Sequence, residues 1–219
     1  MGEAMLQLVP LALAAALSSV PITATIVILL SDGRGGSGLA FLTGTVLGTF
    51  AAVALATVAS HALPRRPRQH AAIVGKLEVV IGIAMVVLGI VTLARRNLAV
   101  GGGAPGWLEG MGSLGMLPVF GIGLALNLRP KALLLVAAAG LAISAPGLEF
   151  NERLLLSLFY TAVATCTVVV PIAATIAFPQ RMEPRLLWSK RWITAHSTVA
   201  SATITILVGT LVFGIGLSG

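Results

Sequence analysis

The sequence has little charge, since only 10% of its residues are Asp, Glu, Lys or Arg, against about 25% in soluble domains. Its mean hydropathy is +1.02 and 57% of its residues are hydrophobic. These values exclude an ordinary soluble domain and indicate an integral membrane protein. Because a transmembrane helix needs about 20 mostly apolar residues, the chain has room for several spans and little else. We therefore expect one integral membrane domain over residues 1–219.

Residues that support common catalytic, redox and metal chemistry are also scarce. Cys166 is the only cysteine, so neither a disulfide nor a dithiol redox pair can form within the chain. His61, His70 and His196 show no metal-ligand spacing, and the sequence has no GxxxxGK[ST] loop. The 7 acidic residues lie mostly between the apolar runs and form no carboxylate pair. We expect no enzyme activity, no cofactor and no metal.

Basic tracts with interleaved aromatic residues are absent, although the formal net charge is +7. The Lys and Arg residues instead lie in short links between apolar runs. This distribution is typical of membrane proteins and disfavours nucleic acid as a partner. Membrane lipids with anionic head groups are the partners that it favours.

Long apolar runs bounded by charged or Gly/Pro-rich links are the pattern of transmembrane helices. The six runs cover residues 5–30, 38–60, 72–94, 114–143, 154–178 and 194–217. For the first run the alternative is a secretory signal peptide, because AAALSS at residues 14–19 resembles a cleavage site. The run is preceded by Glu3 and by no Lys or Arg, and it continues to Leu30, which favours a first span.

The first and fourth runs share a short motif. Residues 16–21 read ALSSVP and residues 125–130 read ALNLRP, so that three residues match at a constant offset. Pro21 and Pro130 each fall near the middle of a run, where a proline breaks or kinks a helix. In transporters built from repeats, proline-interrupted helices at corresponding positions point to a binding site at the membrane midplane.

Each half of the chain then has three spans in the same order. An odd number of spans per half means that the second repeat enters the membrane from the opposite side. We therefore predict an all-α membrane protein with six transmembrane helices, arranged as two inverted three-helix repeats whose first and fourth helices are broken by proline. The repeats cover residues 1–96 and 107–219 and are joined by a linker at 97–106.

The most unusual stretch is LALNLRPKALLL at residues 124–135, where two cations interrupt an apolar run. Pro130 cannot donate to the carbonyl of Leu126, and it favours an extended conformation at Arg129. In an extended segment Arg129 and Lys131 share one side, so we expect both to face an interior cavity while Asn127 satisfies freed backbone groups. A cation at mid-span costs about 2.5–3.5 kcal/mol, which makes these residues candidates for a site that binds phosphate, sulfate or carboxylate.

Hydroxyl residues around Pro21 can form the opposite wall of this cavity. The full set of predicted substrate-binding residues is Ser18, Ser19, Pro21, Thr23, Asn127, Arg129, Pro130 and Lys131. Two alternatives stay open. The hydroxyls can bond to their own helix, and Arg129 and Lys131 can extend to the head groups if the span is shorter than drawn.

Small residues and aromatic residues add two further expectations. Gly44 with Gly48, and Gly82 with Gly89, are spaced for close helix packing in lipid, although chance is the alternative in a chain rich in Gly and Ala. The segment 183–196, EPRLLWSKRWITAH, mixes tryptophans with basic residues. That mixture is typical of an anchor at the membrane surface.

The order of these features resembles the peptidoglycolipid- and sulfolipid-addressing proteins, the GAP or Sap family, which is grouped with the LysE-type exporters. The matching pieces are residues 40–48, Trp107, residues 125–143, Pro171 and residues 191–217. The resemblance implies a multi-pass protein of the plasma (inner) membrane. It also implies export or surface delivery of cell-envelope glycolipids in bacteria with a mycolic-acid envelope.

The family usually has a compact Asn-Pro-Lys motif in the fourth span. By resemblance Asn127, Pro130 and Lys131 take these positions, while Leu128 and Arg129 are inserted between them. The insertion leaves the substrate and the local geometry open. The family supplies no catalytic residues to transfer.

Three functions compete at this point. The first is a transporter or flippase that binds an anionic or polar glycolipid head group at Arg129 and Lys131. The second is a scaffold that transports nothing and docks lipid-synthesis or export machinery. The third is a LysE-like exporter of small solutes such as amino acids, for which Glu78 is a poor intramembrane carboxylate. A homo-oligomer is compatible with each of them.

Overall fold

The computed structural model describes residues 2–31, 34–60, 67–96, 114–145 and 147–218. Every regular element within these ranges is a helix, and no strand occurs among them. The elements are α1 (Gly2–Ala16), α2 (Ser19–Leu29), α3 (Arg34–Ser60), α4 (Pro67–Arg96), α6 (Met116–Ala125), the 3₁₀ helix η2 (Leu126–Leu128), α7 (Pro130–Ile143), α8 (Phe150–Ala177) and α9 (Pro179–Ser218). The all-α fold class is thereby confirmed, and the predicted linker at 97–106 lies outside the described residues.

Three of these helices contain unbroken segments long and apolar enough to cross a membrane. These segments are Gly35–Ser60, Lys76–Ala94 and Phe150–Ala177. The pairs α1 with α2 and α6 with α7 pass the same criterion when each bent pair is taken as one span, which gives up to five spans among the described residues. The sixth predicted run lies in α9, whose described apolar stretch Ala202–Ile215 is shorter than a span.

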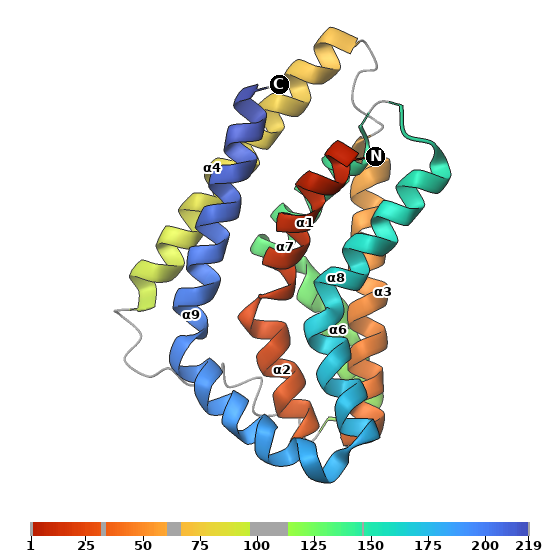
Figure 1. The fold of residues 1–219 in the computed structure, drawn as a ribbon, viewed down its shortest axis with the longest axis vertical. Helices are drawn as coiled ribbons and strands as arrows, with labels where there is room; N and C mark the ends of the chain where they lie inside the picture. Colours follow the sequence, from red (N-terminus) through yellow and green to blue (C-terminus); the bar gives the residue numbers. More distant parts are fainter. Residues whose placement is uncertain (1, 32–33, 61–66, 97–113, 146, 219) are drawn as a thin grey trace.

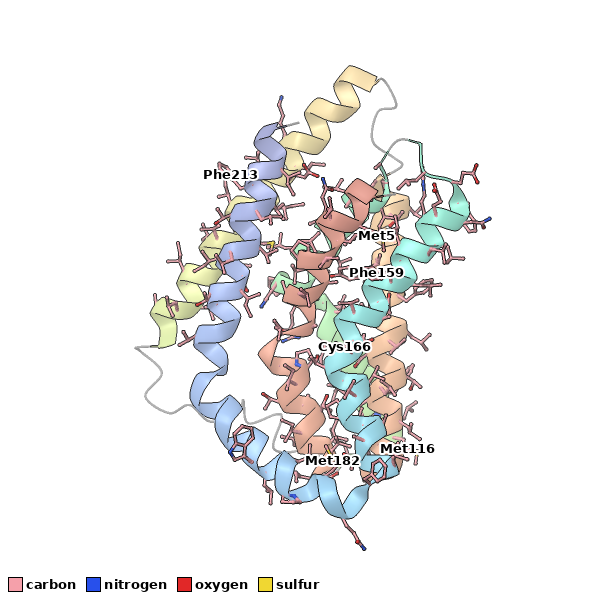
Figure 2. All side chains as sticks on the ribbon, viewed as in Figure 1. Met5, Met116, Phe159, Cys166, Met182 and Phe213 are labelled. Atoms are coloured by element: carbon pink, nitrogen blue, oxygen red, sulfur yellow. The ribbon has the colours of Figure 1, made fainter. Side chains whose placement is uncertain are left out.

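The helices form an elongated bundle (Figure 1). The core has two clusters of buried side chains. One joins α1, α3, α4, α7, α8 and α9 and includes Leu8, Leu135 and Leu156, and the other joins α2, α3, α6, α8 and α9. Large apolar side chains also project outward from the helices (Figure 2), among them Leu6, Leu55 and Val170. Such an apolar exterior would be unfavourable in water and fits a hydrocarbon surrounding.

Glycines allow α3 to cross α6 and η2 at close range. A Cβ atom added at Gly48 would lie 2.7 Å from Asn127 Nδ2, and one at Gly123 would lie 2.8 Å from the Phe41 carbonyl oxygen. Gly44 faces the backbone of Phe120 in the same way. The prediction of close packing at Gly44 and Gly48 is therefore confirmed.

Close packing at glycines also joins α4 to α9, which lie side by side (Figure 1). A Cβ atom at Gly82 would lie 2.6 Å from the Phe213 amide nitrogen, and one at Gly89 would lie 3.2 Å from the Ala202 carbonyl oxygen. Gly209 of α9 faces Gly82 in return. The prediction of close packing at Gly82 and Gly89 is confirmed as well.

Helix α9 has 40 residues, which at 1.5 Å per residue is about twice the thickness of a bilayer's hydrocarbon core. Its first part runs along the base of the bundle before the helix rises beside α4 (Figure 1). Leu186 in this part is buried with Leu29, while Trp188 is exposed. The predicted surface segment 183–196 belongs to this part, and most of its side chains lie outside the described residues.

Candidate functional site

The fourth predicted span is broken where the sequence indicated. The segments Met116–Leu128 and Pro130–Ile143 meet at 66°. Arg129 is extended, with φ −72° and ψ 146°, and Pro130 begins α7 at a position where a proline costs no helical hydrogen bond. The predicted break at Pro130 and the extended conformation of Arg129 are both confirmed.

The carbonyl group freed by Pro130 has a partner that the sequence did not indicate. Arg129 Nε donates to the Leu126 carbonyl oxygen at 3.0 Å. The expected contact of Asn127 with the backbone is made at another carbonyl, since its amide nitrogen donates to the Gly123 carbonyl oxygen at 3.5 Å. The Leu126 carbonyl is left to Arg129, whose side chain is adjacent to the break.

The first predicted span is broken as well, with 47° between Ala4–Ala16 and Val20–Leu29. The break lies at Leu17 and Ser18, ahead of Pro21, which occupies the first turn of α2. A proline is tolerated in a first turn because the amide groups there have no helical partner. On the other side of the break, Thr167 of α8 donates to the Ala16 carbonyl oxygen at 2.7 Å.

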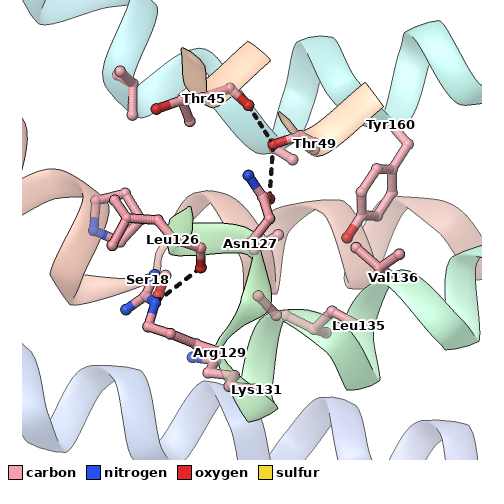
Figure 3. Close-up of a pocket in the computed structure, with 15 residues that line it drawn as sticks. Ser18, Thr45, Thr49, Leu126, Asn127, Arg129, Lys131, Leu135, Val136 and Tyr160 are labelled. Carbon is pink, nitrogen blue, oxygen red and sulfur yellow. Dashed lines mark hydrogen bonds between the residues drawn. The ribbon is translucent and has the colours of Figure 1, made fainter. Parts of the chain in front are cut away.

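A cavity of about 50 Å³ lies between the two breaks, and α3 and α8 complete its walls (Figure 3). Its lining combines cationic, amide, hydroxyl and apolar side chains and contains no acidic residue. A water molecule occupies about 10–15 Å³ on such a measure, so the cavity holds a few waters or one small anionic group.

Most predicted site residues meet at this cavity. Its lining includes Ser18, Pro21, Asn127, Arg129 and Lys131. Both cations therefore line an interior space between helices.

Two other predicted residues, Pro130 and Thr23, do not line the cavity. Pro130 is exposed and Thr23 is half-buried elsewhere on α2. The side chain of Ser19 lies outside the described residues. Thr25, which was not among the predicted residues, lies one turn beyond Pro21 and donates to the Pro21 carbonyl oxygen at 2.8 Å.

Three polar lining residues were missed by sequence reasoning: Thr45, Thr49 and Tyr160. Thr49 Oγ1 lies 3.1 Å from Asn127 Oδ1 and 2.8 Å from the Thr45 carbonyl oxygen, so its single proton is shared between two acceptors. The threonines follow Gly44 and Gly48 directly, so the glycine spacing could have indicated them. Tyr160 is the only tyrosine of the chain.

Two helix N-termini meet at this cavity. Ser18 is the N-cap residue of α2 and Arg129 is the N-cap residue of α7, and neither side chain caps its helix. Helix N-termini carry a partial positive charge and amide groups that bind anions. No acidic residue in the described part of the chain forms an ion pair with Arg129. The arrangement is suited to an anionic group.

The described residues contain no group of three or more His, Cys, Asp or Glu residues that could hold a metal ion. The chemistry available at the cavity is therefore electrostatic attraction and hydrogen bonding by Arg129, Lys131, Asn127 and hydroxyl groups.

No curated protein and no solved structure matches the chain. The family model of Sap, sulfolipid-1-addressing protein, matches residues 8–218, which include both breaks and all described helices except the start of α1. The match covers nearly the whole chain and agrees with the resemblance found in its motifs. The chain therefore belongs to the sulfolipid-1-addressing protein (Sap) family.

Proposed function

We propose that this protein exports cell-envelope glycolipids or delivers them to the cell surface, and that the cavity between the two helix breaks binds their anionic head groups. The family is named for the addressing of a sulfolipid. Apolar helices of membrane length fit a protein that works within the bilayer. The cationic cavity supplies a place where the polar part of a lipid can leave the hydrocarbon.

One observation supports an anionic ligand more than any other. Arg129 and Lys131 line the same cavity in an apolar bundle, at the N-terminus of α7 and opposite the N-terminus of α2. Two cations close together repel each other, and each costs free energy in a low-dielectric interior. An anion offsets both costs, as a substrate carboxylate does at broken helices in other transporters.

The packing supports the inverted repeat as part of this proposal. If α1 with α2 corresponds to α6 with α7, then α3 corresponds to α8 and α4 to α9. Helix α3 packs on α6 and α7, and α8 packs on α1 and α2, as such a symmetry requires. The symmetry would exchange α3 with α8 and α4 with α9, and the members of each of these pairs pack on each other.

The size of the cavity limits what it can hold as it stands. A cavity of about 50 Å³ excludes a whole sugar, so the halves must separate before a glycolipid head group enters.

A substitution of one cation tests the proposal in cells. Lys131→Ala removes a charge from the cavity and should lower the amount of surface glycolipid at least tenfold, because charged hydrogen bonds contribute about 1.5–3 kcal/mol. Lys76→Ala makes the same chemical change at an exposed position of α4 and is the matched control. Protein level and surface glycolipid are measured for both. Unchanged surface glycolipid in a normally expressed Lys131→Ala variant contradicts the proposal.

The two alternative functions give different results. A scaffold for lipid-synthesis or export machinery needs no ligand in the cavity, so Lys131→Ala would leave surface lipid intact. A LysE-like exporter would move labelled amino acids into vesicles, and a cavity with two cations and no acid suits cationic amino acids poorly.

A further inference from the structure

Tyr160 is the largest of the fully buried side chains, with 1% of its surface exposed. Its neighbours Ser157, Thr161 and Thr165 all donate to carbonyl oxygens one turn earlier in α8. The Tyr160 hydroxyl has no hydrogen-bond partner in the part of the chain that the structure describes. A buried hydroxyl without a partner costs about 1–3 kcal/mol, so this group calls for an explanation.

The hydroxyl opens on the cavity. Tyr160 lines the cavity. Among the described residues, every fully enclosed polar side-chain atom has a hydrogen-bond partner, so the unpaired Tyr160 hydroxyl is not fully enclosed. Figure 3 shows the phenol pointing towards Val136 and the interior of the cavity. A partner for this hydroxyl must therefore come from the contents of the cavity.

Tyr160 and the two cations lie at different ends of the cavity. In Figure 3 Arg129 and Lys131 lie at one end, Tyr160 at the other, and Asn127 between them. Asn127 is fixed to α3 by Thr49. The cationic end suits an anionic group, while a phenol and an amide suit an uncharged hydroxyl that both donates and accepts.

We propose that Tyr160 is a ligand-binding residue which, once the helices around the cavity separate to admit a ligand, makes the site prefer anionic head groups bearing sugar hydroxyls over anions without them. The inference rests on the proposed function, since it assumes that Arg129 and Lys131 hold the anionic group. A trapped water is the other partner available to the phenol, and the experiment separates the two.

The test measures the binding of two soluble probes, glucose 6-sulfate and inorganic sulfate, to the purified full-length protein. Tyr160→Phe keeps the ring and removes the hydroxyl. It should raise the Kd for glucose 6-sulfate about three- to tenfold, the range for one uncharged hydrogen bond, and leave the Kd for inorganic sulfate unchanged. Thr161→Val is the matched control, because Thr161 is buried on the same helix and bonds only the Ser157 carbonyl oxygen.

Other outcomes overturn the inference in distinguishable ways. An equal Kd for glucose 6-sulfate in the wild type and Tyr160→Phe means that the phenol binds only water. An equal rise for both probes means that the hydroxyl supports the fold, which a lower Tm would also report. Wild-type protein that binds neither probe, or a Lys131→Ala variant that binds both normally, would instead contradict the anion site of the proposed function. A wild-type preference for glucose 6-sulfate over cyclohexylmethyl sulfate supports a role for sugar hydroxyls independently of any variant.

Discussion

The side chain of Arg129 combines two contacts at the helix break. Its Nε donates to the Leu126 carbonyl oxygen, and the side chain lines the cavity. An unpaired backbone carbonyl in a membrane interior costs several kcal/mol, so this hydrogen bond helps to hold the break open. The remaining guanidinium donors are available to a ligand. Arg129 therefore links the shape of the backbone to the charge of the cavity.

Gly48 gives a residue-scale prediction about the position of Asn127. A Cβ atom there would lie 2.7 Å from Asn127 Nδ2 and 3.1 Å from Leu124 Cα. Gly48→Ala should lower the free energy of unfolding by about 1–3 kcal/mol through overpacking, measured as Tm in detergent. Gly121→Ala is the control, because nothing lies within 4 Å of a Cβ atom at Gly121. A Gly48→Ala variant as stable as Gly121→Ala would contradict the close crossing of α3 and α6.

At this scale the sequence indicated charged residues better than neutral ones. Cations in an apolar run stand out, so Arg129 and Lys131 could be predicted. The bond between Thr49 and Asn127 joins residues 78 apart in the chain, which no local pattern reveals. Tyr160 could not be predicted either, because a single tyrosine in an apolar helix ordinarily belongs to the core.

At the scale of elements, a side chain donates a hydrogen bond to a backbone carbonyl group at each helix break, and the donor differs between the two breaks. A break in a buried helix frees carbonyl groups that lipid cannot satisfy. Thr167 of α8 supplies a donor for Ala16, and Arg129 supplies one for Leu126. The matching motifs ALSSVP and ALNLRP located both breaks to within a turn. They could not show that the first break precedes Pro21, because a proline fits both a break and a first turn.

Removal of the Thr167 hydroxyl tests this account of the first break. Thr167→Val leaves the Ala16 carbonyl without this donor and should lower the free energy of unfolding by about 1–3 kcal/mol, visible as a lower Tm. Thr210→Val is the control, since Thr210 is exposed and bonds only the Ile206 carbonyl oxygen of its own helix. Equal Tm values for the two variants would show that the contact between α1 and α8 contributes no stability.

At the scale of the whole molecule, the hydropathy pattern predicted the helices well because each apolar run must form a helix in lipid. The bounds of α3, α8 and the two broken pairs lie close to the predicted runs. The path of α9 could not be predicted, since the part along the base of the bundle and the part beside α4 form one continuous helix of 40 residues. Which helices pack together depends on glycine contacts such as that between Gly82 of α4 and Gly209 of α9. The spacing of Gly82 and Gly89 indicates a packing face on α4 but does not indicate which helix packs on it.

At the same scale, the cationic cavity between the two helix breaks supports the proposal that this protein itself moves an anionic glycolipid across a bilayer. The direct measurement is the transbilayer movement of a labelled anionic glycolipid in vesicles that contain only this protein. We predict faster movement with the wild-type chain and with Lys76→Ala than in protein-free vesicles, and movement at the protein-free rate with Lys131→Ala. Equal rates in wild-type and protein-free vesicles, or in wild-type and Lys131→Ala vesicles, would contradict the claim.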